Sequence, residues 1–84
     1  MNDLAERLHR EIGNMLRDEK VRESVRALAG YPREDFVQQE MRRRKIDARV
    51  VHIKALPAGM GGDFEIAWQP KAGGGEERQT FSLE

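Results

Sequence analysis

The sequence predicts an α+β domain in which two or three N-terminal helices pack on one face of a three-stranded antiparallel β-meander. Apolar residues recur at a helical period of about 3.6 residues through the first half of the chain. From Ala48 onward the period changes to two, and turn-forming segments separate the runs. We expect the 84 residues to form a single domain, 1–84, because so short a chain cannot be divided into two self-sufficient cores.

The first helix is predicted over about residues 3–18. Asp3 can cap its N-terminus, and Glu6 completes a pair like that of a capping box. One apolar stripe follows at helical spacing and consists of Leu4, Leu8, Ile12, Met15 and Leu16. Near residues 18–20 the stripe changes direction, which indicates either a kink or a second short helix over about residues 19–29. Gly30 then supplies a stop signal.

A third helix is predicted over about residues 32–46. Pro32 suits a first helical position, and the acidic Glu34 and Asp35 suit the first turn. Basic residues at 42–45 suit the last turn, where they complement the helix dipole.

Three strands are predicted over about residues 48–56, 63–69 and 78–83. Apolar and polar residues alternate along each strand, and this alternation predicts that one face of the sheet packs against the core. The residues expected on that face are Val51, Ile53, Ala55, Phe64, Ile66, Trp68, Phe81 and Leu83. The less apolar face would then carry Val50, His52, Lys54, Glu65, Ala67, Gln69, Thr80 and Ser82. Both edges of such a sheet would be free, so a homodimer through edge pairing is an open alternative.

Composition favours a reducing cytoplasm. The chain has no cysteine, which excludes disulfide frameworks and thiol chemistry. No signal peptide is visible, and no apolar run approaches the roughly 20 residues that cross a bilayer. The net charge is zero, with +3 over residues 30–56 and −3 over residues 57–84. A neutral total argues against a dedicated nucleic-acid binder.

No catalytic or metal-binding constellation is evident, so we expect neither an enzyme nor a cofactor. His9 and His52 fall on different elements with no carboxylate at ligand spacing, and His9 is expected at an ordinary solvated surface. The serines and threonines lack a nucleophile motif. The glycine-rich segments 59–62 and 73–75 lie between strands rather than before a helix, which favours hairpin connections over phosphate cradles.

The most pointed feature is the basic run at 42–45. It either contacts phosphate or an acidic protein surface, or compensates a helix C-terminus on a solvated turn. Arg49 and Lys54 could extend the patch if the first strand runs beside the helix end. Tyr31, at a helix junction, is either a corner residue or an exposed contact. The predicted partner-binding residues are therefore Arg42, Arg43, Arg44, Lys45, Arg49 and Tyr31.

Residues 25–37 resemble the bacterial helix-turn-helix pattern, in which Gly30 fits the turn and Phe36 locks the second helix. The resemblance implies DNA binding by helix 33–45, with the 57–63 hairpin loop as the wing of a winged helix. Two features depart from the pattern. Arg26 stands where a small residue is wanted, and two acids, Glu34 and Asp35, begin the would-be recognition helix.

The function predicted from these features is non-enzymatic binding of a partner protein. The chain would be an adaptor, inhibitor or accessory factor of bacterial or phage origin. The alternative is a winged-helix-like DNA-binding protein that uses helix 33–45 and loop 57–63.

Overall fold

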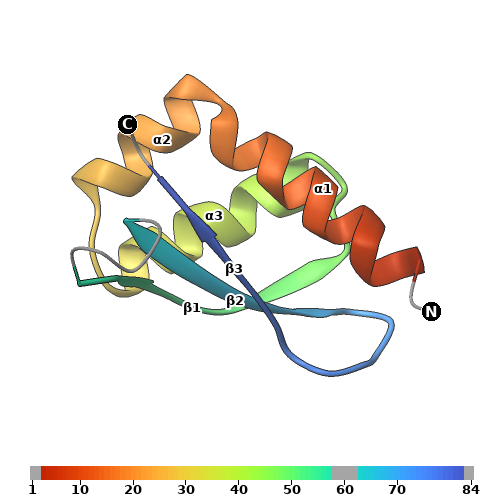
Figure 1. The fold of residues 1–84 in the computed structure, drawn as a ribbon. Coiled ribbons are helices and arrows are strands. Elements are labelled where there is room, and N and C mark those ends of the chain that lie inside the picture. The colour runs from red at the N-terminus through yellow and green to blue at the C-terminus, as the bar shows by residue number, and fades with distance from the viewer. Residues whose placement is uncertain (1–2, 58–62, 83–84) are drawn as a thin grey trace.

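Three helices cover one face of a three-stranded sheet (Figure 1). The computed structural model describes residues 3–57 and 63–82. Its elements in chain order are α1 (Asp3–Arg17), α2 (Glu19–Ala27), α3 (Tyr31–Arg43), β1 (Ala48–Ala55), β2 (Phe64–Pro70) and β3 (Glu77–Phe81). The strands are antiparallel in the order β1-β2-β3. The predicted fold class is confirmed.

The change of direction near Asp18 marks a separate helix rather than a kink. Asp18 has extended backbone angles, and its carboxylate accepts hydrogen bonds from the N–H groups of Lys20 and Val21 at 2.9 and 3.3 Å. These bonds satisfy two of the four amide groups that a helix N-terminus leaves without an internal partner. Gly30, at φ 62°, caps α3 rather than ending α2, which stops earlier at Ala27.

The helices and the sheet share one apolar core, with Trp68 of β2 fully buried within it. The helical stripe predicted for residues 4–16 supplies one side of this core, and Leu8, Ile12 and Met15 are fully buried. His9 also reaches inward, because its ring packs edge-on against Trp68 with the ring centroids 4.9 Å apart.

A β-bulge at Val51 reverses the predicted faces at the start of β1. The register shifts between Val50 and His52, so Val50 packs against the core opposite Trp68 while Val51 is 41% exposed. The prediction that Val51 faces the core and Val50 the open face was therefore wrong. Period-two alternation fails here because the bulge inserts an extra residue that shifts the pattern by one position. Phe81 lies on the core side as predicted, while Leu83 lies outside the described residues.

The outer edge of β1 is covered by α3 rather than free. The side chain of Gln38 donates to the carbonyl of Ala48 at 3.1 Å and accepts from the N–H of Val50 at 2.8 Å. The carboxylate of Glu34 accepts from the N–H of Ile53 at 3.1 Å. These bonds occupy three of the backbone groups through which an added strand would pair. The expectation of two free edges was wrong for β1.

Candidate binding site at the basic end of the domain

The helix α3 ends in a tight turn that places a lysine where glycine is preferred. The N–H of Ile46 donates to the carbonyl of Met41 at 2.8 Å, and the N–H of Lys45 donates to the carbonyl of Arg42 at 3.1 Å. This pair of bonds is a Schellman motif, whose residue beyond the cap adopts the left-handed conformation. Lys45 holds that position at φ 59°, and among the described residues it is the only non-glycine with a positive φ. Its side chain is exposed.

Two of the four consecutive basic residues at 42–45 form ion pairs with carboxylates of the same chain. Arg43 forms a bidentate pair with Glu40, at 2.7 and 3.0 Å. Arg44 reaches Asp18 at 3.2 Å, which joins the end of α3 to the start of α2. The Arg43 guanidinium lowers the pKa of Glu40. The N–H of Val21 and the Arg44 guanidinium together lower the pKa of Asp18. Arg43 and Arg44 therefore both have carboxylate partners within the fold.

The other two basic residues face solvent at a corner of the domain that also carries the exposed Asp47. Arg42 and Lys45 are exposed and form no ion pair within the part of the chain that the structure describes. Arg49 donates to the neutral side chain of Gln69 at 2.7 Å, so its charge is not compensated there. Lys71 lies beside this corner, because its N–H donates to the carbonyl of Asp47 at 3.0 Å.

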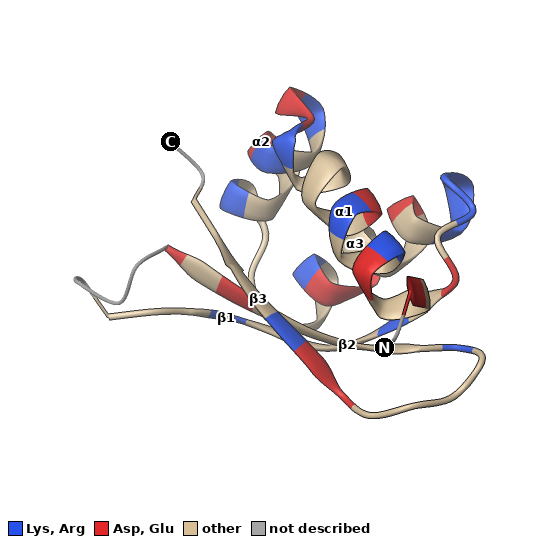
Figure 2. Cartoon of the chain, turned by 45° about the vertical axis from the view of Figure 1, so that its right-hand side comes forward, with Lys and Arg blue, Asp and Glu red and all other residues tan. Residues whose placement is uncertain are grey.

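We call the set of Arg42, Lys45, Arg49 and Lys71 the basic end. Figure 2 shows basic positions on the last turn of α3, on β1 and just beyond β2 at the same end of the domain. Lys71 was missed in the sequence, where it stands alone after Pro70. The register of the sheet places Lys71 here: Ala48 pairs with Pro70, so Lys71, the residue after Pro70, lies beside Asp47.

A small pocket of about 280 Å³ opens at the basic end. Arg49 and Lys71 line it together with Gly73 and Gly74 of the β2–β3 connection. Both glycines have positive φ, at 108° and 122°, so the connection needs a residue without a Cβ at these positions. Two cations beside a pocket of this size can receive a carboxylate or another small anionic group.

Tyr31 does not belong to this site. It is 86% exposed and begins α3, about 16 Å from Arg42 at 1.5 Å per residue. There it lines a shallow pocket with Pro32 and Val50. The last turn of α3, with Arg42 and Lys45, and the start of β1, with Arg49, thus lie at one end of the domain, while Tyr31 lies at the opposite end of the helix.

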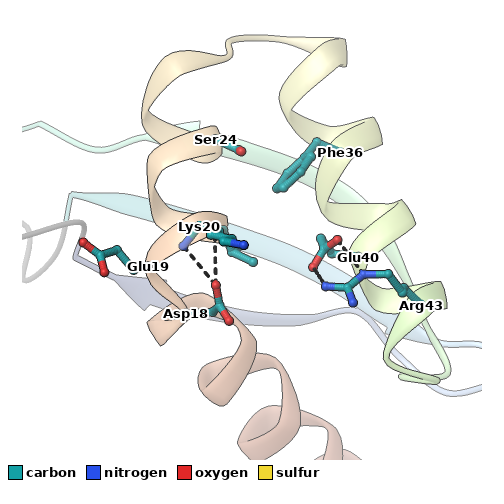
Figure 3. Close-up of a pocket in the computed structure, with 8 residues that line it drawn as sticks. Asp18, Glu19, Lys20, Ser24, Phe36, Glu40 and Arg43 are labelled. Carbon is teal, nitrogen blue, oxygen red and sulfur yellow. Dashed lines mark hydrogen bonds and ion pairs between the residues drawn. The ribbon is translucent and has the colours of Figure 1, made fainter.

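A second groove separates α2 from α3 and has a different character (Figure 3). Phe36 points into it from α3, while Asp18 and Ser24 line it from α2. Glu40 and Arg43, on its other side, are paired with each other. Charges of both signs line this groove, since Glu19 and Lys20 lie beside Asp18 and the pair of Glu40 and Arg43.

Each histidine has one carboxylate partner across the fold. His9 lies 2.9 Å from Glu77, and His52 lies 3.1 Å from Glu65. The bond with His52 and the charge of Lys54 lower the pKa of Glu65. His9 is half-buried, so the expectation of an ordinary solvated position was wrong. In the described ranges no group of three or more metal-ligating side chains comes together.

Comparison with models of protein families, with curated proteins and with solved structures finds no match. Among the described residues, no helix is both long enough and apolar enough to cross a membrane.

Proposed function

We propose that the chain is a small, non-enzymatic binding protein whose basic end contacts an acidic surface on a partner protein. The observation that carries this proposal is Lys45. Its left-handed backbone costs about 1 kcal/mol or more relative to glycine, yet its side chain makes no compensating ion pair within the described part of the chain. Strained backbone of this kind is retained at functional positions more often than elsewhere. A cation held there at a cost in stability supports a role in binding.

The surroundings of Lys45 support the same partner chemistry. Arg42, Arg49 and Lys71 add three cations, none of which has an ion-pair partner within residues 3–57 and 63–82. An acidic protein surface would supply the missing partners, and charged groups around such a contact speed association. In this role the chain would be an adaptor, inhibitor or accessory factor. The absence of cysteine supports a reducing compartment such as a bacterial cytoplasm.

DNA binding by a winged helix has less support. In that arrangement one face of α3 would enter the major groove. Glu34 and Gln38 of α3 are bonded to the backbone of β1, and the exposed Asp35 and Gln39 are bonded to each other at 2.9 Å. The proposed wing, 57–63, lies mostly outside the described residues. DNA binding is therefore the alternative that the nuclease treatment in the following experiment tests.

The test compares three double variants that change the net charge equally. Arg42→Glu/Lys45→Glu alters the basic end, Arg10→Glu/Arg17→Glu alters a different surface, and Arg7→Glu/Lys20→Glu is the control. All six side chains are exposed. Each purified protein is used to capture partners from a lysate of the source cells, with and without nuclease, and the captured proteins are quantified by mass spectrometry.

We expect the wild-type chain and the control to capture the same acidic protein, and the basic-end variant to lose it. Charge reversal should weaken binding about tenfold or more, because two attractive contacts become repulsive. Equal capture by the basic-end variant would contradict the proposal. Capture that disappears after nuclease treatment would favour the DNA alternative.

A further inference from the structure

A groove of about 450 Å³ lies between α1 and the outer edge of the sheet. From α1 it is lined by Arg10, Gly13 and Arg17, and from β3 by Gln79 and Thr80. The side chain of Gln79 bridges the two elements, because its amide donates to the carbonyl of His9 at 3.4 Å. The groove thus combines an edge strand with a flanking helix.

The hydrogen bonds of β1 establish which groups of β3 point outward. Val50 and Ile53 donate their N–H groups to α3 and hence away from β2. Val50 and Ile53 pair with Trp68 and Ile66 of β2. Because backbone groups alternate between the two sides of a strand, the N–H and C=O groups of Trp68 and Ile66 point toward β3. By the register of β2 and β3, Arg78 and Thr80 then direct their N–H and C=O groups to the free edge. The N–H of Asp63 donates to the carbonyl of Phe81 at 3.1 Å. The carbonyl of Phe81 thus points toward β2, as the alternation requires for the residue after Thr80.

This edge differs from the edge of β1. On β1, two side chains of α3 bond the outward backbone groups. On β3, the outward backbone groups of Arg78 and Thr80 have no such partner in the described ranges. An edge strand with open backbone groups is the template on which an extended segment of another chain adds to a sheet.

The charges on the helical side of the groove are of one sign. Arg10 and Arg17 are exposed, and neither forms an ion pair with another described residue. No acidic residue lines the groove, and the nearby Glu77 is paired with His9 at 2.9 Å. The groove therefore complements a segment that carries acidic side chains.

Gly13 stands between the two arginines in the interior of α1. A glycine there destabilises a helix relative to alanine. The packing of the chain does not require it, because an added Cβ would meet only the amide nitrogen of Gln79 at 3.9 Å, an ordinary contact distance. A residue without a side chain leaves the floor of the groove open to an approaching segment.

We propose that this groove binds an extended acidic segment of a partner protein, which adds to β3 as a fourth strand. Its backbone would bond to Arg78 and Thr80, and alternate side chains would face α1. Arg10 and Arg17 lie about 10 Å apart along the helix. Same-face positions of a strand lie about 7 Å apart, so acids at two such positions could reach both arginines. The site does not depend on the basic end.

A second copy of this chain is a poorer occupant. Its own edge segment, Glu77–Phe81, carries one acid and one base and so has no net charge. The acid is already paired with His9. A segment of that composition does not complement two arginines.

The experiment selects ligands for the whole chain from a library of short random peptides displayed on phage. We expect enrichment of peptides with acidic residues at alternate positions. A selected peptide should bind at least about tenfold more weakly to Arg10→Glu/Arg17→Glu than to the control Arg7→Glu/Lys20→Glu. Nuclear magnetic resonance should show slower amide exchange at Arg78 and Thr80 in the complex.

Two further variants separate binding from folding. Gly13→Ala should raise the melting temperature of the free chain, while Gly13→Gln should remove peptide binding without loss of the folded circular-dichroism spectrum. The proposal is overturned if no acidic peptide is enriched, if selected peptides bind the groove variant as they bind the control, or if light scattering shows a dimer that the groove variant abolishes. Loss of binding only in Arg42→Glu/Lys45→Glu would assign the peptide to the basic end and also overturn it.

Discussion

The backbone N–H of Val50 donates to the side-chain oxygen of Gln38 over 2.8 Å, and this bond ties the outer edge of β1 to α3. The same side chain donates to the carbonyl of Ala48 at 3.1 Å. One glutamine thus satisfies two backbone groups of an edge strand. These bonds also show that the N–H of Val50 and the C=O of Ala48 point away from β2.

Replacing Gln38 by alanine should destabilise the domain by about 1–3 kcal/mol, because two partly buried backbone groups lose their partners. Gln39 provides a matched control. It is exposed and, among the described residues, its side chain bonds only to Asp35, so Gln39→Ala should change the free energy of unfolding by no more than about 0.5 kcal/mol. Urea denaturation of both variants measures the difference. Equal destabilisation would show that Gln38 does not cap the edge.

The bulge at Val51 predicts unequal roles for two adjacent valines. Val50 packs against the core and Val51 is 41% exposed. Val50→Ala should cost about 1–2 kcal/mol at about 0.8 kcal/mol for each buried methylene removed. Val51→Ala should cost no more than about 0.5 kcal/mol. A larger loss for Val51 in urea denaturation would place the bulge elsewhere.

Lys45→Gly should stabilise the domain and weaken partner binding at once. Relief of the left-handed strain should add about 0.5–1 kcal/mol to the free energy of unfolding. Lys45→Ala removes the same charge but keeps the Cβ, so it should bind equally weakly without the gain in stability. Thermal denaturation and capture of the partner measure the two effects. Unchanged capture of the partner by both variants would show that the charge of Lys45 does not contribute to binding.

Stability should fall in acid through two carboxylates: Asp18, which pairs with Arg44 of α3 across the two helices, and Glu40, which pairs with Arg43 and Arg44 within α3. Basic or N–H neighbours lower the pKa values of Asp18 and Glu40 in the folded chain. Their contribution is therefore complete only above about pH 5, where both carboxyl groups are also ionised in the unfolded chain, and is lost as the pH falls through the lower folded values. Urea midpoints measured from about pH 6 to about pH 3 should decline less in Asp18→Asn/Glu40→Gln than in the wild type. An identical decline would refute this assignment.

Much of the fold follows from local sequence signals. The helical stripe, its change of direction near residues 18–20 and the period of two from Ala48 each reflect neighbours a few residues apart. The bulge could not be predicted, because Val50 and Val51 are both apolar and either could face the core. Its position depends on pairing with Trp68, which is distant in sequence.

The candidate site was predictable only in part. The basic run was visible, and Glu40 lies at the spacings from which Arg43 and Arg44 can be reached on one helix. The pairing of Arg44 with Asp18 crosses 26 residues and depends on how α2 packs on α3. For the same reason the sequence could not separate the structural arginines from the exposed cations, nor bring Lys71 to them.

Site-specific photocrosslinking tests the central claim most directly. The photoreactive amino acid p-benzoylphenylalanine replaces Lys71 at the basic end and, in a matched control, the exposed Glu23 of α2. We expect irradiation in the source cells to link position 71, but not position 23, to an acidic partner protein. A partner linked at position 23 alone, or only nucleic acid linked at position 71, would contradict it.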